Sequence, residues 1–172
     1  MGHARTHGLV SVIRVTELDA RDELHLRRAI ELSRQARTAG DQPFGSLLVG
    51  QSGEVLAEDV NTEHTERDIT AHPELKLARW AGRKLSLEEA AATTMFTSCE
   101  ACAMCSGAIL ASGLGRVVYA LSAPQLDELR RGSPGKGVRG IDVLAQGDRP
   151  ILVEGPFLLE EAAAEHSGYW LQ

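Results

Sequence analysis

A strand–helix–strand unit over residues 93–121 constrains the fold of this 172-residue chain more than any other feature of its sequence. Thr93–Thr97 and Arg116–Leu121 are short runs rich in apolar and β-branched residues, and Cys102–Ser112 between them reads as a helix. A connection of this kind joins two parallel strands of one sheet and is almost always right-handed. The unit therefore predicts a sheet with parallel strands and a helix packed on its face.

The rest of the chain supplies further elements around this unit. Asp19, Asp22 and Glu23 mark the start of a helix that ends at Gly40. The other expected elements are strands at Ser46–Gly50, Glu54–Val60 and Ile151–Val153, helices at about Ala71 to Ala81 and at Leu158–His166, and loops at 61–70 and Gly132–Gly140, the latter mobile. Their order predicts an α/β fold, a three-layer α-β-α arrangement around a mixed, largely parallel five-stranded sheet.

Composition narrows the class of protein. Apolar residues make up 43% and charged residues 24% of the chain, which is typical of a globular protein, and its length fits one domain over 19–172 after a lead-in at 1–18. No apolar run reaches the roughly 18 residues of a membrane span, and the opening residues lack the apolar core of a secretory signal. A net charge of −6 disfavours nucleic acid as a partner. Three cysteines, an odd number, indicate a reduced, cytoplasmic protein.

The first chemical signal is Cys102-Ala103-Met104-Cys105 at the start of a predicted helix. Two cysteines three positions apart present both sulfurs on one helix face, and the helix N-terminus favours the thiolate that binds metal. Taken alone, the motif is equally typical of a redox pair or of two small buried side chains. Cys99 either joins this pair or fills space beneath the end of the strand.

The second signal is Thr70-Ala71-His72-Pro73-Glu74, also at a junction between a loop and a helix. Proline is tolerated in the first helical turn, so His72 lies at the start of its helix, where it can face a neighbouring helix start. Alone, His72 fits a surface or capping histidine and Glu74 an acid that stabilises the helix dipole. Together with the two cysteines, His72 completes a ligand set suited to Zn²⁺ with a fourth position for water, and Glu74 can move that water's protons.

An H-x-E motif followed by C-x-x-C is the signature of zinc deaminases that act on nucleobases. Ala101 stands where that signature has proline, a change that removes no ligand. The likeness runs from about Pro43 to Tyr119, with landmarks at Pro43-Phe44-Gly45, Asn61, Asp68–Glu74 and Thr97–Ala108. On these residues the chain resembles the cytidine deaminase-like superfamily, and within it the branch of guanine, cytosine and tRNA-adenosine deaminases.

The resemblance implies a zinc-dependent hydrolytic deaminase that replaces an amino group with oxygen and releases ammonia. By position, His72, Cys102 and Cys105 would hold the zinc, and Glu74 would shuttle protons. Pro73, where many relatives have alanine, is a departure that bears on the tilt of Glu74 and on substrate fit. The superfamily commonly forms dimers through the helices that carry these ligands, so the resemblance also implies a homodimer.

The same resemblance marks positions that would bind the substrate. Asn61 would hydrogen-bond the edge of the ring, helped by the backbone at Ala71 and Ser98, and Phe44 would line the same site. Tyr169 and Trp170 close a chain with only 4% aromatic residues; they either pin the last helix to the core or stack on a flat base.

The substrate class stays open between guanine-type and cytosine-type bases or nucleosides. Gln125 stands where guanine deaminases tend to carry an aspartate that handles purine protons. An amide cannot shuttle a proton, so Asp127 or Glu128 would have to replace it.

Two alternatives remain. A tRNA-specific adenosine deaminase should show a basic face, and the sequence offers Arg130, Arg131, Lys136 and Arg139, opposed by an acidic closing segment at Glu160–Glu165. A non-catalytic protein with a closed Cys₃His zinc site would use Cys99 as its fourth ligand and leave Glu74 without a role.

Overall fold

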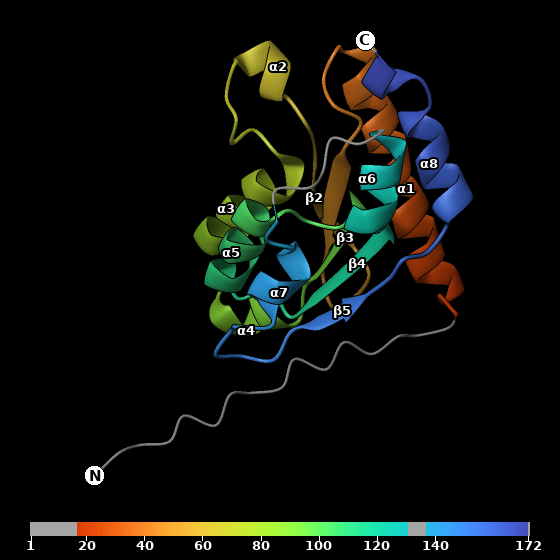
Figure 1. The fold of residues 1–172 in the computed structure, drawn as a ribbon. Coiled ribbons are helices and arrows are strands. Elements are labelled where there is room, and N and C mark those ends of the chain that lie inside the picture. Colours follow the sequence, from red (N-terminus) through yellow and green to blue (C-terminus); the bar gives the residue numbers. More distant parts are fainter. Residues whose placement is uncertain (1–16, 131–136, 172) are drawn as a thin grey trace.

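The computed structural model describes residues 17–130 and 137–171, and a five-stranded sheet runs through its centre (Figure 1). The strands are β1 (Gly45–Val49), β2 (Val55–Val60), β3 (Thr94–Cys99), β4 (Arg116–Leu121) and β5 (Leu152–Glu154). The helices are α1 (Ala20–Thr38), α2 (Glu63–Glu66), α3 (Pro73–Lys84), α4 (Leu87–Ala91), α5 (Ala103–Ser112), α6 (Ala123–Leu129), α7 (Gly140–Leu144) and α8 (Leu159–His166), followed by a 3₁₀ turn at Tyr169–Leu171.

The strands pair in the order β2-β1-β3-β4-β5. β1 is antiparallel to both β2 and β3, whereas β3–β4 and β4–β5 are parallel pairs. The expected mixed five-stranded sheet is confirmed, with parallel and antiparallel pairings equal in number. The unit of β3, α5 and β4 has the parallel pairing that its sequence predicts.

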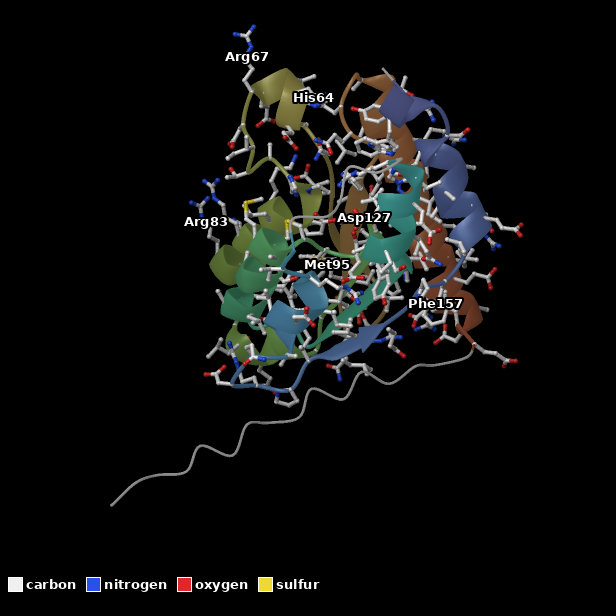
Figure 2. The ribbon with its side chains drawn as sticks, viewed as in Figure 1. His64, Arg67, Arg83, Met95, Asp127 and Phe157 are labelled. Carbon is white, nitrogen blue, oxygen red and sulfur yellow. The ribbon has the colours of Figure 1, made fainter. Side chains whose placement is uncertain are left out.

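Helices cover both faces of the sheet, with α1 and α8 on one side and α3, α5 and α7 on the other (Figure 1). Successive residues of a strand point to opposite faces, so adjacent apolar residues on the central strands enter two separate cores. These pairs are Leu47 and Leu48 on β1, Met95 and Phe96 on β3, and Val117 and Val118 on β4. Burial on both faces explains why these strands read as continuous apolar runs; Figure 2 marks Met95 inside the molecule.

The prediction that residues 61–70 form a plain loop is wrong, because Glu63–Glu66 form the short helix α2. The carboxylate of Asp41 supplies the reason: it accepts hydrogen bonds from the backbone N–H groups of His64 (2.7 Å) and Thr65 (3.0 Å). These bonds satisfy donors at the start of the helix from a residue more than twenty positions away. A local sequence pattern cannot reveal such a cap.

Helices α4, α6 and α7 were not expected from the sequence. Capping boxes at Ser86 with Glu89 and at Ser122 with Gln125 start the first two. Gly140, expected to end the mobile loop, begins α7. The rest of that loop lies mainly outside the described residues, as does the lead-in up to residue 16.

None of the helices within 17–130 and 137–171 combines the length and hydropathy that a membrane span requires.

The C-terminal segment packs on the core of the α1 side through aromatic contacts. The ring of His166 stacks on Trp170, with centroids 5.8 Å apart at 14°, and lies 5.4 Å from Phe44. The guanidinium of Arg130 sits 4.3 Å from the centroid of Trp170. His166 is 2% exposed, and neither of its ring nitrogens has a hydrogen-bond partner among the described residues. This histidine is therefore built into the fold as a neutral aromatic ring.

Stability should fall with acidity because of His166. Burial, and then the charges of Arg130 and Arg37, lower the pKa of this imidazole to about 4 from its ordinary 6.5. Between these values the unfolded chain binds a proton that the native state does not, so the free energy of unfolding decreases as pH falls. From pH 7 to pH 5 we expect this group to cost about 2 kcal/mol.

Denaturant unfolding of the wild type and of His166→Phe across that range measures the effect. The variant should show the shallower dependence on pH, and equal slopes would contradict the assignment.

Candidate metal and catalytic site

The starts of α3 and α5 meet at one edge of the molecule and bring the two motifs together. His72 is the N-cap residue of α3 and Cys102 the N-cap of α5, both with extended backbone. Pro73 fixes the first position of α3, where its missing N–H costs no hydrogen bond. Cys105 follows in the first turn of α5 and is fully buried.

The three candidate ligands have the separations of a tetrahedral metal site. Cys102 Sγ and Cys105 Sγ are 3.6 Å apart, and His72 Nδ1 lies 3.8 and 3.6 Å from them, respectively. Zinc bound by thiolates at about 2.3 Å and imidazole at about 2.0 Å would place the sulfurs about 3.8 Å apart and each sulfur about 3.5 Å from the nitrogen. The residues therefore fit zinc without rearrangement.

The two thiols differ in acidity. The pKa of Cys102 is lowered to about 4, mainly because the Cys105 thiol hydrogen-bonds to its sulfur and also through His72. The pKa of Cys105 is raised, because the same hydrogen bond holds its proton and its sulfur is buried. One thiolate is thus ready for a metal, and since metals bind the deprotonated form, metal binding would release the proton of the other.

Glu74 is buried beside this group, at 4% exposure. Its Oε1 lies 2.8 Å from Thr97 Oγ1, a hydroxyl that accepts a hydrogen bond from Ser46 Oγ at 2.9 Å. Burial raises the pKa of the Glu74 carboxyl, with His72 and Thr97 opposing the shift. The contact with Thr97 holds the carboxyl in place. Glu74 does not belong to the group of possible metal ligands among the described residues, so its carboxyl is available for proton transfer.

The side-chain amide of Asn61 is buried, and its oxygen but not its nitrogen has a hydrogen-bond partner among the described residues. Its backbone N–H donates to Phe44 O at 2.9 Å, and its Oδ1 accepts from Glu63 N at 3.0 Å. Its Nδ2 is buried and has no hydrogen-bond partner within the described part of the chain. Since buried donors are normally paired, this N–H₂ group is suited to a ligand that brings an acceptor.

The other expected substrate positions also make contacts within the protein. Ala71 N donates to Asp68 O, and Ala71 O accepts from Thr62 N, both at 3.0 Å. Ser98 is buried, and its Oγ accepts from Gly45 N at 3.1 Å. Tyr169 packs edge-on against Trp170 at 4.8 Å, and Trp170 stacks on His166, so these aromatics pin the C-terminal segment to the core in this structure.

The structure also locates Cys99, Gln125 and Asp127, for which the sequence left alternative roles open. Cys99 is buried outside the group of possible metal ligands found among the described residues, and burial raises the pKa of its thiol. Gln125 Oε1 accepts from the N–H and hydroxyl of Ser122 at 2.9 and 2.7 Å, so this side chain caps α6. Asp127 lies on the same helix (Figure 2).

Sequence reasoning missed two contacts around this site. The carboxylate of Glu63 faces His72 from α2, with Oε2 3.4 Å from Nε2. Glu100 accepts from Arg139 Nη2 at 2.9 Å and from Ala123 N at 3.0 Å, which ties the segment before Cys102 to later parts of the chain. No spacing rule could have found either pair, because they join separate elements.

Comparison with known proteins decides the family. Residues 19–121 match the model of the cytidine and deoxycytidylate deaminase zinc-binding region. The chain belongs to this deaminase family. It is therefore a zinc-dependent deaminase, and the group of His72, Cys102 and Cys105 that could hold a metal lies within the matched residues.

Three relatives of this deaminase illustrate the range of the family. The chain is 36% identical over 159 residues to a probable cytosine deaminase of Schizosaccharomyces pombe, and the match covers 90% of this chain and 96% of that protein. It is 33% identical to a tRNA-specific adenosine deaminase of Haemophilus influenzae, covering 59% of this chain and 58% of that protein. A structure of guanine deaminase from Nitrosomonas europaea superposes with a TM-score of 0.73 at 25% identity, covering 100% of this chain and 99% of that one.

Removing a ligand should remove the metal. We expect Cys105→Ser to weaken zinc binding by more than about 100-fold, since loss of an outer partner alone costs 10–100-fold. Cys99→Ala is the matched control, because Cys99 is buried nearby without belonging to the ligand group. Zinc content after dialysis and competition with a chelator measure both; zinc loss in the Cys99 variant would instead favour a Cys₃His site.

Proposed function

We propose that this deaminase acts on a small guanine-type or cytosine-type base or nucleoside and releases ammonia. The observation that carries the proposal is the presence of two buried polar groups: the Glu74 carboxyl next to His72, and Asn61 Nδ2, which has no hydrogen-bond partner among the described residues. The first suits proton transfer and the second suits recognition of a ring acceptor. Similarity to the probable cytosine deaminase over nearly its whole length and to the guanine deaminase structure supports the same substrate class.

His72, Cys102 and Cys105 would hold the zinc, which supplies Lewis-acid activation of water when bound. Glu74 takes a proton from that water and delivers it to a ring nitrogen of the base. The oxygen of that water would bond to the amino-bearing ring carbon. Glu74 then carries the remaining proton of this oxygen to the amino group, the C–N bond breaks, ammonia leaves, and the carbon becomes a carbonyl carbon. Thr97, at 2.8 Å, keeps the carboxyl oriented throughout. Asn61 Nδ2 donates to an acceptor on the ring and so orients the amino-bearing carbon.

Glu74→Gln tests this assignment. The amide keeps the size of the side chain and can still pair with Thr97, but it cannot carry a proton. We expect ammonia release to fall by about 10²–10⁴-fold, the usual worth of a general acid–base, with zinc content unchanged.

The assay uses zinc-loaded protein with guanine, cytosine, adenine, isoguanine and their nucleosides. Undiminished turnover in the variant would contradict the role of Glu74. Loss of zinc together with turnover would assign the carboxyl to metal binding instead.

A tRNA substrate is the second candidate, favoured by the similarity to tRNA-specific adenosine deaminases. Against it, two of the four cations that the sequence offered already contact other groups of the protein, although Arg139 keeps 45% of its side chain exposed. Arg130 lies over the rings of Trp170 and Phe44, and Arg139 pairs with Glu100. Arg131 and Lys136 lie outside the described residues. Turnover of a tRNA transcript alone would reverse this preference.

We also propose that the protein works as a homodimer in the cytoplasm. Ile69, just before His72, is 77% exposed, and Met104, between the two cysteines, is 38% exposed, so apolar surface flanks both helix starts. All three cysteines are free thiols, which fits a reducing compartment.

Light scattering after gel filtration tests the assembly. We expect a mass near twice 18.5 kDa, and Ile69→Glu should shift it toward the monomer. A wild-type protein that elutes as a monomer at all concentrations would contradict the dimer.

A further inference from the structure

The imidazole of His72 lies between the cysteines and a carboxylate. Its Nδ1 faces Cys102 Sγ and Cys105 Sγ at 3.8 and 3.6 Å, and its Nε2 lies 3.4 Å from Glu63 Oε2. A neutral imidazole that gives one nitrogen to a metal carries its proton on the other. With Nδ1 on a metal, the proton would sit on Nε2, the ring nitrogen that lies near the Glu63 carboxylate.

The carboxylate of Glu63 is itself held in place. Gln42 Nε2 donates to Glu63 Oε2 at 2.8 Å, so the same oxygen faces both Gln42 and His72. Asp41, the residue before Gln42, is fully buried and caps α2 through His64 and Thr65. The segment between α1 and β1 thus anchors both the short helix and the side chain that α2 presents to His72.

The backbone of Glu63 reaches a second functional residue. Its N–H donates to Asn61 Oδ1 at 3.0 Å and so fixes which way the amide points. With its oxygen engaged, Asn61 has its Nδ2 left for a ligand. Side-chain replacement at position 63 leaves this backbone bond available, so it removes the contacts with His72 and Gln42 while keeping the one with Asn61.

We propose that Glu63 is a positioning residue of this deaminase, whose carboxylate fixes the ring orientation and the Nε2 proton of His72 and thereby strengthens metal binding. The assignment rests on the proposed function for its catalytic meaning, but its effect on the metal is independent of any substrate. Carboxylates that face the outer nitrogen of a ligating histidine are typically worth 10–100-fold in metal affinity. In this chain, the contact between Glu63 and His72 depends on α2, which carries Glu63, and on Gln42, which holds the carboxylate.

Zinc affinity of the wild type and three variants, measured by chelator competition, tests the proposal. We expect Glu63→Ala to bind zinc about 10–100-fold more weakly. Glu63→Gln should recover part of that loss, because its Oε1 can still accept from Nε2 without the negative charge. Glu66→Ala is the matched control: Glu66 is exposed on the same short helix, and its side chain makes no hydrogen bond or ion pair within the described residues. It should bind zinc as tightly as the wild type.

A second readout separates positioning from a general loss of structure. The absorption bands of the cobalt-substituted protein report ligand geometry and should shift in Glu63→Ala but not in Glu66→Ala. At saturating zinc, KM should change little in Glu63→Ala, since the bond to Asn61 comes from the backbone. Zinc affinity within twofold of the wild type in Glu63→Ala, or an equal loss in Glu66→Ala, would overturn the proposal. Failure of the proposed substrate class would appear instead as absent turnover in a wild type that binds zinc normally.

Discussion

The packing of α3 against α5 on one face of the sheet is the constraint on which the site depends. Their buried faces share one core, which includes Leu77 and Ala81 of α3 and Cys105 and Ile109 of α5. The packing brings the two helix starts together, and the ligands occupy the N-cap or first turn of each. Because the helices rest on a sheet covered on both faces, the core sets the separations of the ligands.

The segment from Asp41 to His72 forms the second half of the site. It carries Asn61, whose Nδ2 has no hydrogen-bond partner among the described residues, and the short helix α2 with the Glu63 carboxylate that lies near His72. Its anchor is a buried aspartate at the end of α1 rather than an apolar contact. The candidate metal ligand His72 and the proposed base-binding residue Asn61 are thus linked through Glu63, whose side chain faces the first and whose backbone N–H holds the second.

The sequence predicted the parts of the site that depend on local order. His72, Glu74, Cys102 and Cys105 lie in short motifs at helix starts, where capping and spacing rules apply directly. The three central strands were also recognisable, because both of their faces are buried and their sequences are largely apolar. Helices α4 and α6 carried capping boxes that sequence reasoning overlooked. In contrast, α2 and the contact between Glu63 and His72 depend on residues far apart in the chain, and no local pattern encodes them.

X-ray absorption at the zinc edge distinguishes an open metal site from a closed one, since it counts the atoms bound to the metal in the intact protein. An open catalytic site held by His72, Cys102 and Cys105 predicts two sulfur neighbours at about 2.3 Å and two nitrogen or oxygen neighbours at about 2.0 Å, one of them from solvent. The spectrum should be unchanged in Cys99→Ala. Three sulfur neighbours, falling to two in that variant, would contradict the account and indicate a closed structural site.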